Sequence, residues 1–373
     1  MILILEPNSA PESTDYKVLT SQLDRLPGIT YRVHREVGAE VTLTELYLIG
    51  NTGALTMEQM QVLPCVSRVV RVSEAYRVLG RHKQGDERPT SFEYQGVKFG
   101  QDTLNVFAGL CAVDSRESVE AMMKALQAHG QVCTRMGAYK PRTNPYAFQG
   151  FGASCLPYVF ELAGKYGIKV IAMEITHESH IDEIRAALRT TGDPTGVMLQ
   201  IGTRNTQNFE LLKLVGKQQD FPVLIKRGFG ITLDESLNAA EYLASEGNRK
   251  VVFGLRGMKT NMGDPHRNFV DFSHVPVVKR LTRMPVCIDP SHSVGTRSAA
   301  PDGILDIFHV VAQGVVAGAN MVLVDFHPNP AQALVDGPQA LLMAELPHFL
   351  DDVALARETY LKRSVLAGKY RPH

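Results

Sequence analysis

The chain has 373 residues, of which 44% are hydrophobic and 21% charged, and its 39 basic and 39 acidic side chains give a formal net charge of zero. This composition is ordinary for a globular protein and excludes the disordered and fibrous classes. The balanced charge leaves no overall field that would attract nucleic acid or an anionic membrane, so neither is expected as a partner.

Residues 1–80 predict a small α+β domain of the ferredoxin-like type. Strands are expected over residues 2–6, 30–35, 46–49 and 66–72, and helices over 14–26 and 56–63. Two βαβ units of this size are typical of the split βαβ fold. The apolar start has no basic flank and ends at Glu6, which indicates a strand rather than a signal peptide.

Residues 81–103 predict a linker followed by a hairpin. The stretch 80–90 is polar and contains Gly and Pro, which is typical of a connection between domains. The stretch 91–103 holds two short runs around Gln95-Gly96, which favours a hairpin turn there.

From residue 104 to residue 373, apolar strands alternate with helices. Eight βα units in about 270 residues favour a (β/α)8 TIM barrel. A doubly wound open sheet is the rival fold, although eight regular units are rare in an open sheet. The strands are expected over residues 105–108, 132–136, 169–175, 196–201, 223–226, 251–254, 286–289 and 321–325, with helices between them such as 117–129, 233–245 and 300–317.

Cations follow most of the predicted barrel strands, at the end where a barrel carries its active site. A single surface cation is usually only solvated, but six at one mouth would repel one another unless an anion lay between them. Because arginine binds phosphate and carboxylate in bidentate geometry, the cluster predicts phosphorylated, acidic substrates. The six are Arg135, Lys140, Arg142, Arg204, Lys226 and Arg256.

A second group of strand-end residues predicts a metal site: Cys111, His292, Asp325 and Asp336. They follow strands one, seven and eight, which become neighbours when the barrel closes. Thiolate, imidazole and carboxylate ligands suit Mn, Fe, Co or Zn, and such an ion would polarise a carbonyl oxygen. A buried cysteine, a core histidine and two helix-capping carboxylates remain the alternative. The five cysteines are odd in number and scattered, which is typical of a reducing cytoplasm.

Several motifs carry a resemblance over nearly the whole chain. They resemble the signatures of 3-deoxy-D-arabino-heptulosonate 7-phosphate (DAHP) synthases, and residues 1–80 resemble the ferredoxin-like regulatory domain of the type I-beta subgroup. The motifs are the stretch from Arg135 through Lys140-Pro-Arg-Thr143 to Gly150, Gln200-Ile-Gly-Thr-Arg-Asn-Thr-Gln-Asn-Phe209, Lys226-Arg-Gly228, Asp289-Pro-Ser-His292, His327-Pro-Asn-Pro and Asp336-Gly-Pro-Gln339.

The resemblance implies a cytoplasmic, divalent-metal-dependent enzyme. It would condense phosphoenolpyruvate with erythrose 4-phosphate to DAHP and phosphate, as the first step of the shikimate pathway does. In some family members the small domain binds an aromatic amino acid, and such barrels form dimers or tetramers. The implied metal ligands are Cys111, His292, Asp325 and Asp336, the implied catalytic residues are Lys140, Cys111 and His292, and the implied substrate-binding residues are Arg135, Lys140, Arg142, Thr143, Glu174, Arg204, Lys226, Arg256 and Asp289.

Four positions depart from the family pattern. Leu110 replaces the usual Pro, Asp325 the usual Glu, Leu255 a Glu, and Thr296 an Arg. Two alternatives therefore stay open: a divergent paralogue that uses another phosphorylated aldehyde, and a non-catalytic phosphoenolpyruvate-binding sensor. A 3-deoxy-octulosonate 8-phosphate synthase is disfavoured by Lys140-Pro-Arg-Thr143 and by the extra N-terminal domain.

Overall fold

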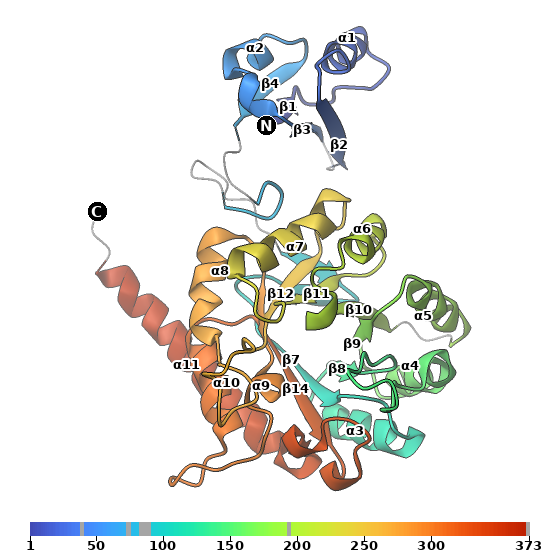
Figure 1. Cartoon of the computed structure of the whole chain (residues 1–373), viewed down its shortest axis with the longest axis vertical. Helices are drawn as coiled ribbons and strands as arrows, with labels where there is room; N and C mark the ends of the chain where they lie inside the picture. Colours follow the sequence, from blue (N-terminus) through green and yellow to red (C-terminus); the bar gives the residue numbers. More distant parts are fainter. Residues whose placement is uncertain (38–40, 72–75, 82–90, 192–194, 371–373) are drawn as a thin grey trace. The chain divides into compact units, whose positions relative to one another are not determined.

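The computed structural model describes residues 1–37, 41–71, 76–81, 91–191 and 195–370. The chain divides into two compact units, Met1–Arg77 and Val78–His373 (Figure 1). Most of the predicted linker falls on residues 82–90, which lie outside the described residues. Within the described segments, no helix combines the length and the apolar character that a membrane span needs.

The first unit is an antiparallel sheet with strand order β2-β3-β1-β4 and two helices. This βαββαβ order confirms the predicted ferredoxin-like fold. Strand β3 begins at Thr42, earlier than predicted, because residues 42–45 pair with residues 34–37 of β2 although most of them are polar. The elements are β1 (Ile2–Leu5), α1 (Thr14–Leu23), β2 (Ile29–Val37), β3 (Thr42–Gly50), α2 (Met57–Gln61) and β4 (Val66–Val70).

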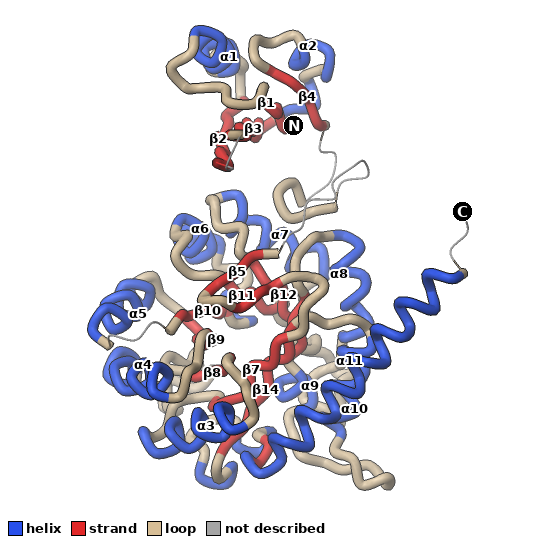
Figure 2. Tube along the Cα trace, turned by 180° about the vertical axis from the view of Figure 1, so that it is seen from behind, coloured by secondary structure: helices blue, strands red, loops and turns tan. Residues whose placement is uncertain are grey.

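In the second unit, eight parallel strands close into a barrel, which confirms the predicted TIM fold. Strand β14 pairs with both β7 and β13, so the ring has no open edge (Figure 2). A two-residue strand, β15 (Leu341–Leu342), pairs in parallel with Phe326 and His327 at the end of β14. The barrel strands are β7 (Asn105–Leu110), β8 (Cys133–Met136), β9 (Val170–Ile175), β10 (Gly196–Ile201), β11 (Val223–Lys226), β12 (Val251–Leu255), β13 (Val286–Ile288) and β14 (Met321–His327).

Helices surround the barrel and bury their apolar faces against it (Figure 1). The helix predicted over residues 300–317 begins only at Asp306, because Pro301 and the positive φ of Gly303 form a turn before it. The helices are α3 (Arg116–Ala128), α4 (Leu156–Lys165), α5 (Ser179–Thr190), α6 (Phe209–Lys217), α7 (Leu233–Ser245), α8 (Val275–Leu281), α9 (Pro290–Val294), α10 (Asp306–Val316) and α11 (Leu346–Lys369).

A hairpin of β5 (Phe92–Tyr94) and β6 (Val97–Phe99) closes the amino-terminal end of the barrel, because Val97 and Phe99 pack into the core that the barrel strands form there. Its turn residues, Gln95 and Gly96, both have positive φ, as a two-residue hairpin turn requires. Tyr94 accepts a hydrogen bond from the backbone N–H of Val197 at 3.2 Å, next to the start of β10. With this end closed, the carboxyl ends of the strands form the accessible mouth.

Candidate active site

A polar cavity of about 270 Å³ lies at the carboxyl ends of the barrel strands. Three predicted residues that do not line it, Cys111, Asp289 and Asp325, contact residues of its wall. Arg135 lies behind them, where its guanidinium pairs with Asp325. The structure therefore brings all of the predicted site residues to one mouth. The predicted residues that line the cavity are Lys140, Arg142, Thr143, Glu174, Arg204, Lys226, Arg256, His292 and Asp336.

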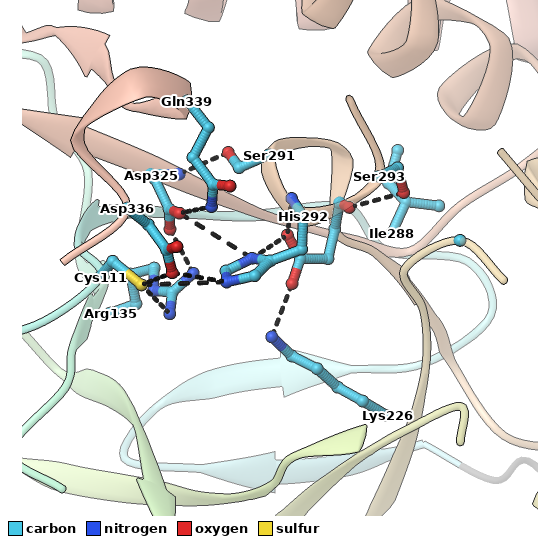
Figure 3. A network of polar contacts seen from close by, with 12 residues as sticks. Cys111, Arg135, Lys226, Ile288, Ser291, His292, Ser293, Asp325, Asp336 and Gln339 are labelled. Carbon is cyan, nitrogen blue, oxygen red and sulfur yellow. Dashed lines mark hydrogen bonds and ion pairs between the residues drawn. The ribbon is translucent and has the colours of Figure 1, made fainter. Parts of the chain in front are cut away.

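Three of the predicted metal ligands form a compact cluster at one side of the cavity (Figure 3). The Sγ atom of Cys111 lies 3.2 Å from Oδ2 of Asp336 and 3.9 Å from Nε2 of His292, and Nε2 lies 3.5 Å from Oδ2 of Asp336. One ligand atom from each residue fits within 4.8 Å of the others. A thiolate, an imidazole and a carboxylate at this spacing suit a divalent transition metal.

The imidazole of His292 is oriented by Asp289 from the preceding strand end. Oδ1 of Asp289 lies 3.0 Å from Nδ1 of His292, which leaves Nε2 facing Cys111 and Asp336. A carboxylate on the far nitrogen is a common way to fix a metal-binding histidine. Burial raises the pKa of Asp289, but His292, Lys226 and Arg135 outweigh it and hold that pKa well below its usual range.

Asp325 lies apart from this three-residue cluster. Its buried carboxylate pairs with the guanidinium of Arg135 through one oxygen and accepts a 2.6 Å hydrogen bond from Nε2 of Gln339 through the other. Its approach to His292 is to Nδ1, at 3.8 Å, and not to the nitrogen that faces the cluster. The sequence predicted four metal ligands. In the structure, Cys111, His292 and Asp336 lie together, whereas Asp325 forms an ion pair with Arg135.

Carboxylates at the same strand ends pair with two more of the predicted cations. The ammonium of Lys226 lies 2.6 Å from Oδ2 of Asp289, and that of Lys140 lies 3.5 Å from Oε2 of Glu174. The Lys140 ammonium is also 3.4 Å from Sγ of Cys111. Burial lowers the pKa of Lys140, but Cys111 and Glu174 outweigh it, so the pKa is raised and the group stays cationic. The expected repulsion within the cluster is thus partly relieved.

Among the residues that the structure describes, no carboxylate forms an ion pair with Arg256. Its side chain is nearly fully buried, and within the described part of the chain its Nη1 has no hydrogen-bond partner. Burial lowers the pKa of Arg256 to about 10, which leaves the guanidinium charged at neutral pH. A buried N–H group without an acceptor is unfavourable, so this position favours an incoming anion. Across the mouth, Nη2 of Arg204 donates to Oγ1 of Thr143 at 3.1 Å.

Sequence reasoning missed Arg267 and gave Gln339 no role. Nη1 of Arg267 lies 3.2 Å from Oδ1 of Asp336 and 2.8 Å from Oε1 of Gln339, so these residues link the metal cluster to the Asp325 pair. Arg267 lies far along the loop after β12, and the expectation that site residues directly follow the barrel strands does not extend to it. Gln339 belongs to a motif that was recognised, which was the available signal.

The amino-acid sequence matches the model of the DAHP synthetase I family over residues 83–359. The chain is 34% identical over 341 residues to phospho-2-dehydro-3-deoxyheptonate aldolase of Thermotoga maritima, covering 91% of this chain and 93% of that protein. It is also 28% identical over 269 residues to a 2-dehydro-3-deoxyphosphooctonate aldolase of a Bradyrhizobium species, covering 68% of this chain and 88% of that protein.

Two solved structures are also similar to this chain. The crystal structure of the Thermotoga maritima DAHP synthase is similar with a TM-score of 0.69 and 32% identity, over 96% of this chain and 97% of that one. A truncated form of the Thermotoga maritima enzyme matches with a TM-score of 0.61 and 30% identity, over 79% of this chain and 98% of that one. With the family model covering most of the sequence, the chain belongs to the DAHP synthetase I family.

Proposed function

We propose that this enzyme condenses phosphoenolpyruvate with erythrose 4-phosphate in a metal-dependent reaction that gives DAHP and inorganic phosphate. The observation that carries the proposal is the adjacency of the Cys111–His292–Asp336 cluster to a cavity lined by Lys140, Arg256 and further cations. A polarised carbonyl next to sites for anionic groups is what the joining of two phosphorylated, acidic substrates requires.

Phosphoenolpyruvate is assigned to the inner part of the cavity. Arg256, with its unpartnered Nη1, is the natural site for the phosphate, together with Lys226 and Arg204. Arg135 and Lys140 are assigned to the carboxylate end, because both remain cationic and lie beside Sγ of Cys111 at 3.6 and 3.4 Å. This arrangement would direct C3 of phosphoenolpyruvate toward the metal cluster.

The aldehyde is assigned to the outer part of the cavity. Arg142 and Thr143 would hold its phosphate, and the hydrogen bond from Arg204 to Thr143 joins the two phosphate sites. A divalent metal held by Cys111, His292 and Asp336 would supply Lewis-acid polarisation of the aldehyde oxygen. Asp325 would support this chemistry through Arg135.

Lys140 is assigned the proton transfer to the oxygen that becomes negative when C3 attacks the aldehyde carbon. Its ammonium lies 3.5 Å from Glu174, which is placed to receive or return the proton. Attack by C3 leaves C2 electron-poor, so water adds there and returns one proton to the amine of Lys140. The C2–O bond to phosphate then breaks, the remaining hydroxyl proton goes to the phosphate, and C2 becomes a ketone. The cations Lys226 and Arg256 bind the phosphate alike before and after this bond breaks, so they contribute to substrate affinity.

The test is phosphoenolpyruvate consumption by EDTA-stripped protein, with erythrose 4-phosphate or arabinose 5-phosphate and with or without Mn²⁺. Consumption with erythrose 4-phosphate only in the presence of metal is the expected result, and it should vanish in Cys111→Ala. Consumption with arabinose 5-phosphate would favour the octulosonate-type reaction, a candidate because of the relatives named 2-dehydro-3-deoxyphosphooctonate aldolase. Tight binding without turnover with either sugar would contradict the proposal and favour another aldehyde or the sensor.

The small unit is proposed to bind an aromatic amino acid, and the chain to assemble as a dimer or tetramer in the cytoplasm. Support comes from the ferredoxin-like fold of this unit and from five cysteines that are all free thiols, as in a reducing compartment. Melting curves of the full chain with phenylalanine, tyrosine or tryptophan, together with light scattering, would test the binding and the assembly. No shift with any of the three would contradict the binding proposal.

A further inference from the structure

The ring of Phe229 lies among three cations, of which Arg256 is buried and Arg204 and Lys259 are exposed. Phe229 follows Lys226-Arg-Gly228 in the loop after β11 and lines the cavity wall. The guanidinium carbon of Arg256 lies 4.8 Å from the centre of its ring, and that of Arg204 lies 5.5 Å away. The ammonium of Lys259 lies 5.9 Å from the same centre. Loops after β10 and β12 thus place their cations over one aromatic side chain.

The positive charges around Phe229 lie close enough to repel one another. Arg204 and Arg256 repel each other, and burial together with that repulsion contributes to the lowered pKa of Arg256. The face of a benzene ring carries negative charge density and attracts a cation within about 6 Å. The ring therefore favours the charged form of Arg256 and holds two loops together before any substrate anion arrives.

An aromatic ring and a carboxylate both attract a cation, but only the carboxylate accepts hydrogen bonds from the cation's N–H groups. Lys226 and Lys140 are each paired with a carboxylate, which competes with an incoming phosphate for their N–H groups. The Phe229 ring has no hydrogen-bond acceptor of that kind, so it attracts the guanidinium of Arg256 without occupying its N–H groups. Among the described residues, the buried Nη1 of Arg256 has no hydrogen-bond partner.

From this geometry we infer that Phe229 is a positioning residue for phosphate binding, which holds Arg204 and Arg256 in place through cation–π contacts without neutralising them. The inference rests on the proposed function only in that the anion is the phosphate group of phosphoenolpyruvate. Phe229 itself touches the cations and not the reacting atoms. Its effect belongs to substrate affinity rather than to the chemical step.

The experiment uses the full chain and the variants Phe229→Leu and Phe229→Tyr. Leucine keeps an apolar side chain but removes the ring, whereas tyrosine keeps the ring. The matched control is Phe92→Leu, which removes a half-buried ring that stacks on Phe99 at 5.1 Å in the hairpin at the opposite end of the barrel. Calorimetry measures the dissociation constants of inorganic phosphate and of phosphoenolpyruvate, and melting curves check folding.

Phe229→Leu is expected to weaken both ligands roughly tenfold, the size of one or two cation–π contacts in a partly desolvated site. Phe229→Tyr and Phe92→Leu are expected to stay within about twofold of the unchanged protein. In turnover, Phe229→Leu should raise KM for phosphoenolpyruvate while kcat stays within about twofold. A leucine variant that binds phosphate as tightly as the unchanged protein, or a tyrosine variant as weak as leucine, would overturn the inference.

A second measurement separates cation–π attraction from packing and serves if the leucine variant fails to fold. Phenylalanine at position 229 is replaced by mono-, di- and trifluorophenylalanine, which keep the ring shape while draining charge from its face. The logarithm of phosphate affinity should fall stepwise with each fluorine, and a flat series would overturn the inference. Phosphate binding needs no turnover, so a stepwise fall in a protein that consumes no phosphoenolpyruvate would contradict the proposed reaction alone. A protein that binds no phosphate would contradict the Phe229 inference itself.

Discussion

Asp325 and Arg135 form an ion pair in which the carboxylate is completely buried and the guanidinium is 3% exposed. Asp325 comes from β14 and Arg135 from β8, so the pair spans β7, the strand that leads to Cys111. Nη2 of Arg135 also lies 3.6 Å from Sγ of Cys111. Asp325, one of the four positions that depart from the pattern the resemblance implies, therefore lies next to the cluster of Cys111, His292 and Asp336.

Asp325→Asn should lower the free energy of unfolding by about 3 kcal/mol, because it leaves the buried Arg135 charge without a counter-charge. Chemical denaturation of the two proteins measures the difference. The control is Asp220→Asn, which breaks an exposed pair with Arg185 and should change stability by less than about 1 kcal/mol. Equal losses in the two variants would contradict the importance given to the buried pair.

Asp325→Glu should preserve or raise the affinity for Mn²⁺ or Co²⁺. The added methylene moves the carboxylate away from β14 by roughly 1 Å, and a metal site responds to shifts of about 0.2 Å. Competition with a metal-binding dye gives the dissociation constants. A marked loss of affinity would mean that the longer side chain disturbs Arg135 instead of reaching toward the cluster.

Cys111→Ala should weaken Co²⁺ binding by more than about 100-fold, since loss of outer-shell partners alone weakens metal sites 10- to 100-fold. The sulfur-to-cobalt charge-transfer absorption should disappear as well. Cys133→Ala is the matched control, because Cys133 is buried in β8 and burial raises the pKa of its thiol to about 12. Cobalt absorption that survives in Cys111→Ala would remove this cysteine from the site.

Residues 78–81 should be needed for a stable barrel, although the sequence assigned residues 78–80 to the small domain and residue 81 to the linker. The backbone N–H groups of Val78 and Leu79 donate to the carboxylate of Glu241 at 2.6 and 3.0 Å, and Gly80 pairs with Thr282 in a β-bridge. These contacts belong to the second compact unit.

A chain that starts at Val78 is therefore expected to fold and to melt as the barrel does in the full protein. A chain that starts at Ser91 should lose roughly 2–3 kcal/mol through the missing hydrogen bonds. Differential scanning calorimetry of both chains gives the comparison. Identical melting of the two would place the domain boundary beyond residue 81.

The barrel should lose stability as the pH falls from about 7 to 5. Burial first, and then the charge of Arg227, lower the pKa of His274, and Nη1 of Arg227 lies 2.8 Å from Nδ1 of His274. The unfolded chain, with a histidine pKa near 6.5, then binds more protons in this range, so unfolding is favoured by acid. Because His274 is partly exposed, its share is at most about 1 kcal/mol. His274→Gln should flatten the pH profile by that amount, and an unchanged profile would contradict the assignment.

The sequence by itself determined the order of the elements and the end of the barrel that holds the site. Apolar runs with a strand period, separated by helical periods, are local signals, and they marked the eight βα units and the ferredoxin-like order. The rule that reactive groups gather at strand ends then located Lys140, Arg256 and His292. Residue type alone was enough to predict anion and metal chemistry there.

Only the tertiary structure decided which side chains meet. The sequence grouped Asp325 with the metal ligands, but barrel closure directs its carboxylate to Arg135, two strands away. Arg267 lies far along the loop after β12, so its approach to Asp336 has no local signal. Phe229 directly follows a recognised motif, but residue type alone does not show that its ring meets Arg256. The periodicity of neighbouring residues predicts where the strands lie along the chain. Which side chains contact each other depends instead on loop paths and strand register. Those are fixed only when distant segments pack together.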